Sequence, residues 1–130
     1  MLTYGIYIAQ LLYFCIAKSY CSAYNIDITR EGNNGHGPVD FKFSRGYHDK
    51  VLIEVKLTSN SRLTHGIKTQ LPIYMKQENA QKAIYLIIDT GHPKALKNFE
   101  AFYHTLDADL KNKIEYLVID ATPKKSASKA

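Results

Sequence analysis

The sequence predicts an α/β domain in which a mixed central sheet is flanked by helices. Five short strand-like runs alternate with stretches of helical periodicity, in the order α-β-β-β-α-β-α-β. One of these runs, residues 83–89, is apolar almost throughout, which is typical of a central strand covered on both faces. The chain of 130 residues has the size of one domain. We assign residues 1–121 to this domain and residues 122–130 to a basic tail without apolar pattern, for which disorder is expected.

The composition is that of an ordinary soluble protein, with 45% hydrophobic and 22% charged residues. The formal net charge is +5, but three of the lysines lie in the tail, so the domain itself is only mildly basic. Such a charge permits a polyanionic partner without requiring one. Cys15 and Cys21 are roughly 9 Å apart along a helix, too far for a disulfide, and no zinc-type Cys/His spacing is present. We expect a reducing compartment, the cytoplasm.

The first element is a helix over residues 4–23, which carries no charge before Lys18. This segment could be mistaken for a signal or a membrane anchor. Gln10 and several tyrosines interrupt it, however, and it is shorter than the ~20 apolar residues that a span needs. We therefore expect a buried amphipathic helix and no membrane contact. A short strand over residues 24–29 follows.

A glycine-rich loop over residues 30–38 leads into two strands, 38–44 and 50–57, joined by a turn around Gly46. Residues 59–81 are mostly helical in pattern, although Pro72 interrupts the pattern, because proline removes a helical hydrogen bond. The remaining predicted elements are a helix over 93–106 and a last strand over 114–120.

The register of the hairpin decides what its polar residues can do. A register centred on Tyr47 gives an entirely apolar inner face, in which the opposed pairs are Val39 with Val55, Phe41 with Ile53, and Phe43 with Val51. The same register places Asp40 directly opposite Glu54, and Lys56 on the same face two residues further on. Like charges roughly 5 Å apart in a sheet are destabilising.

Two interpretations of these three charges remain open at this point. They could be solvated positions on a polar face, with Lys56 neutralising the carboxylates. They could instead form a site in which a cation offsets the repulsion, and Mg²⁺ suits such a site because it prefers oxygen ligands and often takes one or two carboxylates.

Three segments, "GPVDF", "IEVKL" and "QLPIY", resemble the PD-(D/E)XK superfamily of restriction-endonuclease-like nucleases. The spacing of Gln70 and Tyr74 is similar to the extra motif of its RecB-like branch, and the stretch over residues 20–41 is similar to uncharacterised bacterial members. The resemblance covers about residues 10–90. It implies a core of α-β-β-β-α-β topology, extended here by a helix and a strand, and hydrolysis of DNA phosphodiesters that depends on Mg²⁺ or Mn²⁺.

The resemblance also implies roles for individual residues. Asp40 and Glu54 match the acidic metal ligands, and the backbone carbonyl of Val55 would be a third. Lys56 matches the lysine of the ExK step, which positions a water molecule and stabilises charge, and Gln70 matches a glutamine that orients the site. The chain departs from the pattern in its first helix, which lacks the glutamate that members of the superfamily often place there.

Further residues near these motifs could contact phosphates or bases, and they are His36, Lys42, Arg45, Lys68 and Tyr74. The alternative for the charged ones is a solvated surface, and for Tyr74 it is core packing. The expected function is a metal-dependent nuclease acting on DNA, with RNA as an alternative substrate, in defence, repair or processing of mobile elements. A catalytically inactive nucleic-acid-binding or assembly module on the same fold is the alternative function. A homodimer is left open.

Overall fold

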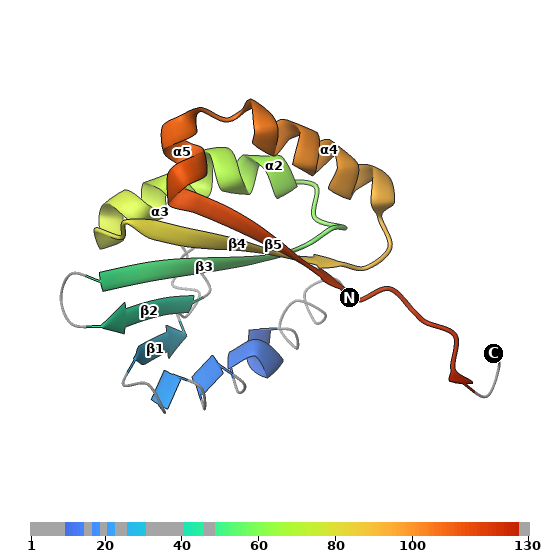
Figure 1. Ribbon diagram of the computed structural model, residues 1–130, viewed down its shortest axis with the longest axis horizontal. Coiled ribbons are helices and arrows are strands. Elements are labelled where there is room, and N and C mark those ends of the chain that lie inside the picture. Colours follow the sequence, from blue (N-terminus) through green and yellow to red (C-terminus); the bar gives the residue numbers. More distant parts are fainter. Residues whose placement is uncertain are drawn as a thin grey trace.

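The computed structural model describes residues 10–14, 17–18, 21–22, 26–30, 41–45 and 49–127. It shows an α/β fold built on a five-stranded mixed sheet in the order β1-β2-β3-β4-β5 (Figure 1). The strands are β1 (Asp27–Arg30), β2 (Phe41–Arg45), β3 (Asp49–Leu57), β4 (Lys82–Asp89) and β5 (Ile114–Asp120). Strand β2 is antiparallel to both of its neighbours, β1 and β3, while β3, β4 and β5 run parallel. The predicted mixed sheet is therefore confirmed.

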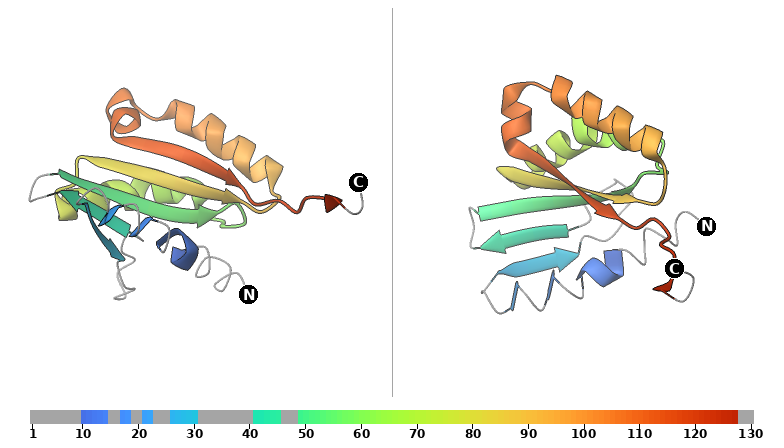
Figure 2. Two further views of the ribbon diagram at one scale, coloured as in Figure 1. Left: turned by 60° about the horizontal axis from the view of Figure 1, so that its bottom comes forward. Right: turned by 45° about the vertical axis from the view of Figure 1, so that its right-hand side comes forward.

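One face of the sheet is covered by the helices that follow β3 and β4 (Figure 1). These are α2 (Leu63–His65), the π-helix η1 (Gly66–Gln70), α3 (Leu71–Glu78), α4 (Pro93–Thr105) and α5 (Ala108–Lys113). The described residues of the predicted first helix, 10–14, 17–18 and 21–22, are helical and lie on the other side of the sheet (Figure 2). No helix of the described residues is long and apolar enough to cross a membrane.

The sheet separates two apolar cores. The larger core lies beneath the helices, where Phe99 of α4 and Ile67 of η1 pack on the buried side chains Tyr85 and Ile87 of β4. The smaller core lies on the opposite face, where Phe41, Ile53, Val55 and Leu86 are buried. Val55 and Leu86 alternate with residues of the larger core along their strands, so β3 and β4 are covered on both faces, as the apolar run of β4 predicts.

The predicted register of the hairpin is confirmed where the structure describes it. Phe41 is opposite Ile53 and Phe43 is opposite Val51, and this register places the apolar side chains of both strands on one face. The turn around Gly46 and the pair of Val39 with Val55 include residues outside the described ranges, as does the glycine-rich loop.

The predicted helix over residues 59–81 consists of three consecutive segments. The backbone N–H of Leu71 donates to the carbonyl of Gly66, five residues earlier, which closes the wide turn of η1. Pro72 then lies in the first turn of α3, where a missing N–H leaves no hydrogen bond unmade. The proline is therefore accommodated by a change of helical type.

The short helix α5, which the sequence pattern did not predict, begins at the Asp107 cap, whose side chain accepts from the Leu110 N–H at 2.8 Å.

The packing of α4 on the sheet yields the first prediction. The Phe99 ring is fully buried, 5.5 Å from the ring centroid of Tyr85 and 5.3 Å from that of Tyr116. We expect Phe99→Ala to lower the free energy of unfolding by about 3–5 kcal/mol, since it removes these contacts and leaves a cavity. Urea denaturation measures the change. The matched control is Ile73→Ala on the exposed surface of α3. We expect it to lower the free energy of unfolding by less than about 1 kcal/mol. Equal losses in both variants would contradict this account of the core.

Candidate functional site

A buried ion pair on the middle strand of the sheet forms the centre of the candidate site. The Lys56 Nζ lies 3.0 Å from the Glu54 Oε1, and the two side chains are only 16% and 8% exposed. Both residues belong to β3, which pairs with β2 on one side and β4 on the other. Strand alternation places them on the same face as Leu52, which packs in the core beneath the helices. The pair therefore lies between the sheet and the helical layer.

The burial of this pair has an energetic consequence. Removing two charges from water costs several kcal/mol for each ion, and their attraction offsets this cost only in good geometry. A well-packed apolar pair would often stabilise the fold as well or better. Each member of the pair, however, depends on the other, because removal of one leaves an uncompensated charge in a place with little solvent. Stability alone therefore does not explain the presence of the pair.

The π-helix η1 lies directly over Lys56. A Cβ atom built on Gly66 would overlap the Tyr85 Oη and would lie 3.3 Å from the Lys56 Cε. Any side chain at position 66 would thus displace the tyrosine hydroxyl or the stem of the lysine. The absence of a side chain at Gly66 allows the first turn of η1 to approach β3 and β4 closely.

Tyr85 joins this part of the helical layer to the sheet. Its ring is fully buried, and its hydroxyl donates a 2.6 Å hydrogen bond to the carbonyl of Leu63 in α2. In the parallel register of β3 and β4, Tyr85 is the partner of Glu54. The tyrosine therefore holds α2 and η1 in position next to the ion pair.

The two predicted helical residues differ in their surroundings. Gln70 is half-buried and ends η1, one turn after Gly66. Tyr74 is half-buried in α3 and packs against the larger core. Core packing therefore explains the half-buried position of the Tyr74 ring.

The predicted metal ligands are only partly described. Glu54 is buried at the site, and the side chain of Val55 points into the smaller core on the opposite face. Asp40 lies outside the described residues, as does His36, so the predicted pair of carboxylates has one described member. Within the described ranges, no group of three or more His, Cys, Asp or Glu side chains is arranged to hold a metal ion.

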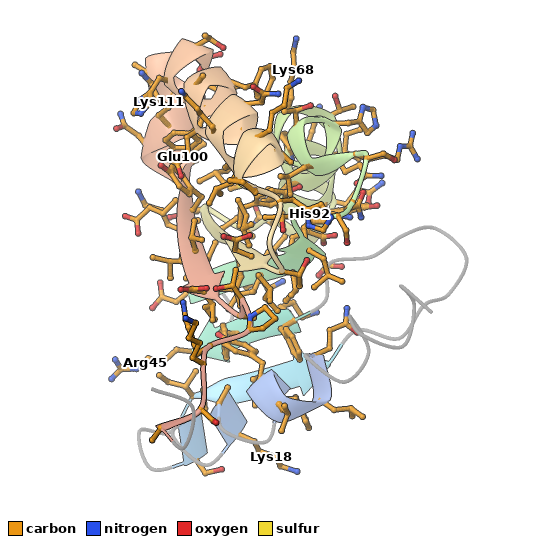
Figure 3. All side chains as sticks on the ribbon, turned by 90° about the vertical axis from the view of Figure 1, so that its right-hand side faces the viewer. Lys18, Arg45, Lys68, His92, Glu100 and Lys111 are labelled. Carbon is orange, nitrogen blue, oxygen red and sulfur yellow. The ribbon has the colours of Figure 1, made fainter. Side chains whose placement is uncertain are left out.

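The predicted phosphate contacts are dispersed over the described structure. The Lys42 Nζ lies 3.1 Å from the Glu78 Oε2, which ties β2 to the end of α3. The Lys68 Nζ lies 5.9 Å from the centre of the Phe102 ring on α4. Arg45 is exposed at the end of β2, and Figure 3 shows Arg45 at the level of the strands and Lys68 among the helices. Among the predicted site residues that the structure describes, only Glu54 and Lys56 are therefore in contact with each other, and η1 lies above them.

The same face of β3 continues beyond Lys56 into a group of polar residues. Thr58 is 2% exposed, and its Oγ1 accepts from the Thr90 N–H at 3.0 Å and donates to the Asp89 Oδ1 at 3.2 Å. The Nδ1 of His92 lies 3.4 Å from the same oxygen of Thr58, and Figure 3 shows His92 beside the start of α4. These residues lie at the carboxyl ends of parallel strands, where open α/β sheets commonly bind ligands.

Asp89 organises the turn that carries His92. Its Oδ1 accepts from the backbone N–H groups of Gly91 at 3.0 Å and His92 at 3.3 Å. The Gly91 N–H, together with the donors His92 and Thr58, lowers the pKa of Asp89 below its ordinary value of 3.8, because these donors favour the carboxylate. Gly91 has φ +102°, a conformation that favours glycine.

Sequence reasoning did not identify Gly66, Tyr85 or Thr58 as parts of the site. Two signals were available. A glycine in the interior of a helical pattern costs about 1 kcal/mol relative to alanine, which suggests that its lack of a side chain has a use. A tyrosine within an apolar strand requires a partner for its hydroxyl. Neither signal indicates which residues meet.

The fold and this site define an α/β domain with a buried acid–lysine pair on its central strand. A family model for a domain of unknown function, DUF8371, matches residues 7–92, and the chain belongs to this family. Comparisons with the curated proteins and with the solved structures gave no match. The matched range contains β1 to β4, η1 and the Glu54–Lys56 pair.

The close packing at Gly66 yields a prediction about stability. We expect Gly66→Ala to lower the free energy of unfolding by about 1–3 kcal/mol, since the new Cβ overlaps the Tyr85 Oη. In a Tyr85→Phe background, which lacks this oxygen, the same substitution should cost at least about 0.5 kcal/mol less. Urea denaturation of the four variants of this double-mutant cycle measures both values. Strictly additive losses would show that Gly66 and Tyr85 do not constrain each other.

The turn at Asp89 yields a prediction about pH. Because folding lowers the pKa of Asp89, its contribution to stability is present above about pH 3.8 and is lost as the pH falls through the lower folded value. We therefore expect the melting temperature of the wild type to fall more steeply below pH 4 than that of Asp89→Asn. Identical slopes in the two proteins would refute the assignment.

Proposed function

We propose that this protein is a metal-dependent nuclease that hydrolyses DNA phosphodiester bonds with Mg²⁺ or Mn²⁺, on a core of the restriction-endonuclease-like type. The buried Glu54–Lys56 pair carries the proposal, because it places a carboxylate and an ammonium 3.0 Å apart on the central strand. The confirmed hairpin register supports it, because Phe41 pairs with Ile53, and these two residues are the sequence neighbours of the predicted ligands: Phe41 directly follows Asp40, and Ile53 directly precedes Glu54.

The π-helix above the pair provides further support. Segments of π-helix are rare overall, and those that occur are frequently found at functional sites. Here η1 ends at Gln70, and its first residue packs on Lys56. The proposed role of Gln70 is to orient the site from this helix.

The residues that would hold the metal are Asp40, Glu54 and the backbone carbonyl of Val55. The described part of this set fits a hard cation, because Glu54 supplies carboxylate oxygens and Mg²⁺ prefers oxygen ligands. A bound ion supplies Lewis-acid stabilisation of the charge that develops on the phosphate and acidifies a water molecule. The chain's own contribution is to hold Glu54 in place through Lys56 and to keep both away from bulk water.

Lys56 has the second role in the proposal. Its ammonium is held by Glu54 at one end of the side chain, and its stem lies beneath Gly66. A lysine constrained in this way is a fixed positive charge, which suits the orientation of an attacking water and the stabilisation of a phosphate in the transition state. Removal of one such electrostatic donor commonly costs about 10²–10³ in rate.

A cleavage assay tests the proposal. Single-stranded, duplex and nicked DNA are incubated with the chain in Mg²⁺, Mn²⁺ or EDTA, and products are separated by denaturing gel electrophoresis. We expect cleavage with either metal, none in EDTA, and a loss of about 10²-fold or more in Lys56→Met and Asp40→Ala. Lys50→Met is the matched control, because Lys50 lies on the same strand but contacts the Glu78 carbonyl at 3.2 Å, away from the pair. It should cleave as the wild type does.

The alternative outcomes distinguish the proposed nuclease from a binding module. DNA binding without cleavage in any metal, measured by fluorescence anisotropy, would favour the inactive nucleic-acid-binding module. Cleavage that persists equally in Lys56→Met and Asp40→Ala would refute the assigned residues. Cleavage of RNA in place of DNA would keep the site and change the substrate.

A further inference from the structure

The outer strand β5 exposes an apolar segment at the open edge of the sheet. Leu117, Val118 and Ile119 are 52%, 38% and 47% exposed, and they are consecutive, so both faces of the strand are apolar at this place. Natural edge strands are usually protected by lysines, prolines or bulges, because their unpaired backbone groups can pair with another strand. In β5 the charged residues Glu115 and Asp120 flank the apolar segment and leave its centre unprotected.

The other edge of the sheet has a different character. Strand β1 has four residues, "DITR", and begins and ends with charged residue types. Short, charged edge strands resist pairing with other chains. Strand β5, unlike β1, therefore has the character of an interaction surface.

The hydrogen bonds of β5 show which backbone groups face outward. The Ala121 N–H donates to the Asp89 carbonyl at 2.9 Å, which continues the parallel ladder between β4 and β5. In a parallel ladder, the backbone N–H and C=O groups of alternate residues point to the same neighbouring strand. The backbone groups of the odd-numbered residues of β5 therefore bond to β4. The N–H and C=O groups of Tyr116, Val118 and Asp120 therefore point to the open edge, where no strand of the described residues pairs with them.

We propose that this edge binds a second copy of the chain, with the two β5 strands pairing antiparallel around Val118 in a continuous ten-stranded sheet. A two-fold axis perpendicular to the sheet keeps each face on its own side, so directly opposed residues must belong to the same face. Three registers satisfy this condition near the middle of β5, and they are centred on Tyr116, Leu117 or Val118.

Side-chain chemistry selects one of these registers. In the register centred on Val118, the two copies of Val118 are directly opposed. Leu117 of each copy is opposite Ile119 of the other, so the three exposed apolar residues pair with one another. Around Leu117, the carboxylate of Asp120 would face Ile114 instead. Around Tyr116, Glu115 would face Leu117. The register centred on Val118 also avoids opposed like charges, because Asp120 faces Tyr116 and Glu115 faces Ala121.

This self-complementarity is the reason for naming a second copy as the occupant. A C₂ interface requires one surface to match itself, and the apolar centre with polar flanks of β5 does so without any other chain. We propose a Kd in the micromolar range for this contact, which corresponds to about −8 kcal/mol. The inference is independent of the proposed nuclease activity.

Sedimentation equilibrium of the full chain tests the dimer. At about 100 µM, well above a micromolar Kd, we expect a mass of about 30 kDa, twice the 14.8 kDa of one chain. Val118→Lys should halve this mass, since it opposes two like charges across the axis. Ile73→Lys is the matched control, because Ile73 is 49% exposed on α3, away from the edge, and it should remain dimeric.

A mixing experiment tests the register. Val118→Lys and Val118→Glu should each be monomeric alone, and an equimolar mixture should restore a mass near 30 kDa, because residue 118 then faces an opposite charge. Circular dichroism of each variant confirms that the fold is retained. A monomeric wild type at this concentration, or a dimer that persists in Val118→Lys, would overturn the proposal. A mixture that stays monomeric would overturn the register. A monomeric wild type would leave the edge to a strand from another protein.

Discussion

The close approach of η1 to the sheet is the constraint on which the rest of this structure depends. Gly66 lies against the Tyr85 hydroxyl and the Lys56 stem, and the same hydroxyl binds the Leu63 carbonyl at 2.6 Å. These contacts set the height of the helical layer above β3 and β4. The large core, in which Phe99 stacks on Tyr85, assembles around the same ring. Tyr85 therefore contributes both to the position of the ion pair and to the packing of the larger core.

This arrangement explains how a strand can carry charge inside a core. The residues that face the helices change along β3 from apolar Leu52 to Glu54 and Lys56, and Thr58 follows directly after the strand; all four are largely buried. Each polar group has a partner within reach: the lysine for the glutamate, and Asp89 and Thr90 for the threonine. Such partners offset part of the cost of desolvation, and the apolar opposite face of the strand supplies the stability.

The hairpin register and the order of the elements could be predicted from the sequence, because both follow from periodicity that is local to the chain. Alternation of apolar residues fixes which face of β2 and β3 is buried, and the short connection between the two strands then makes Ile53 the partner of Phe41. The meeting of Gly66 with Tyr85 could not be predicted, since it joins residues of different elements through tertiary packing. Helix α5 was missed because its six residues are too few for a periodic signal. The predicted carboxylate pair extends beyond the described residues at Asp40.

The two proposals combine in one geometric consequence. A two-fold axis perpendicular to the sheet would keep both Glu54–Lys56 pairs on the same face of the ten-stranded sheet. Five strand intervals separate β3 from its copy in the order of the sheet, which at about 4.8 Å each gives roughly 24 Å. Each pair lies between the sheet and the helical layer of its own chain, so the helices of both copies would stand between the two pairs on that face. The dimer would therefore double the number of sites without requiring both to act on one DNA molecule, and loss of the dimer would leave the cleavage chemistry of each site unchanged.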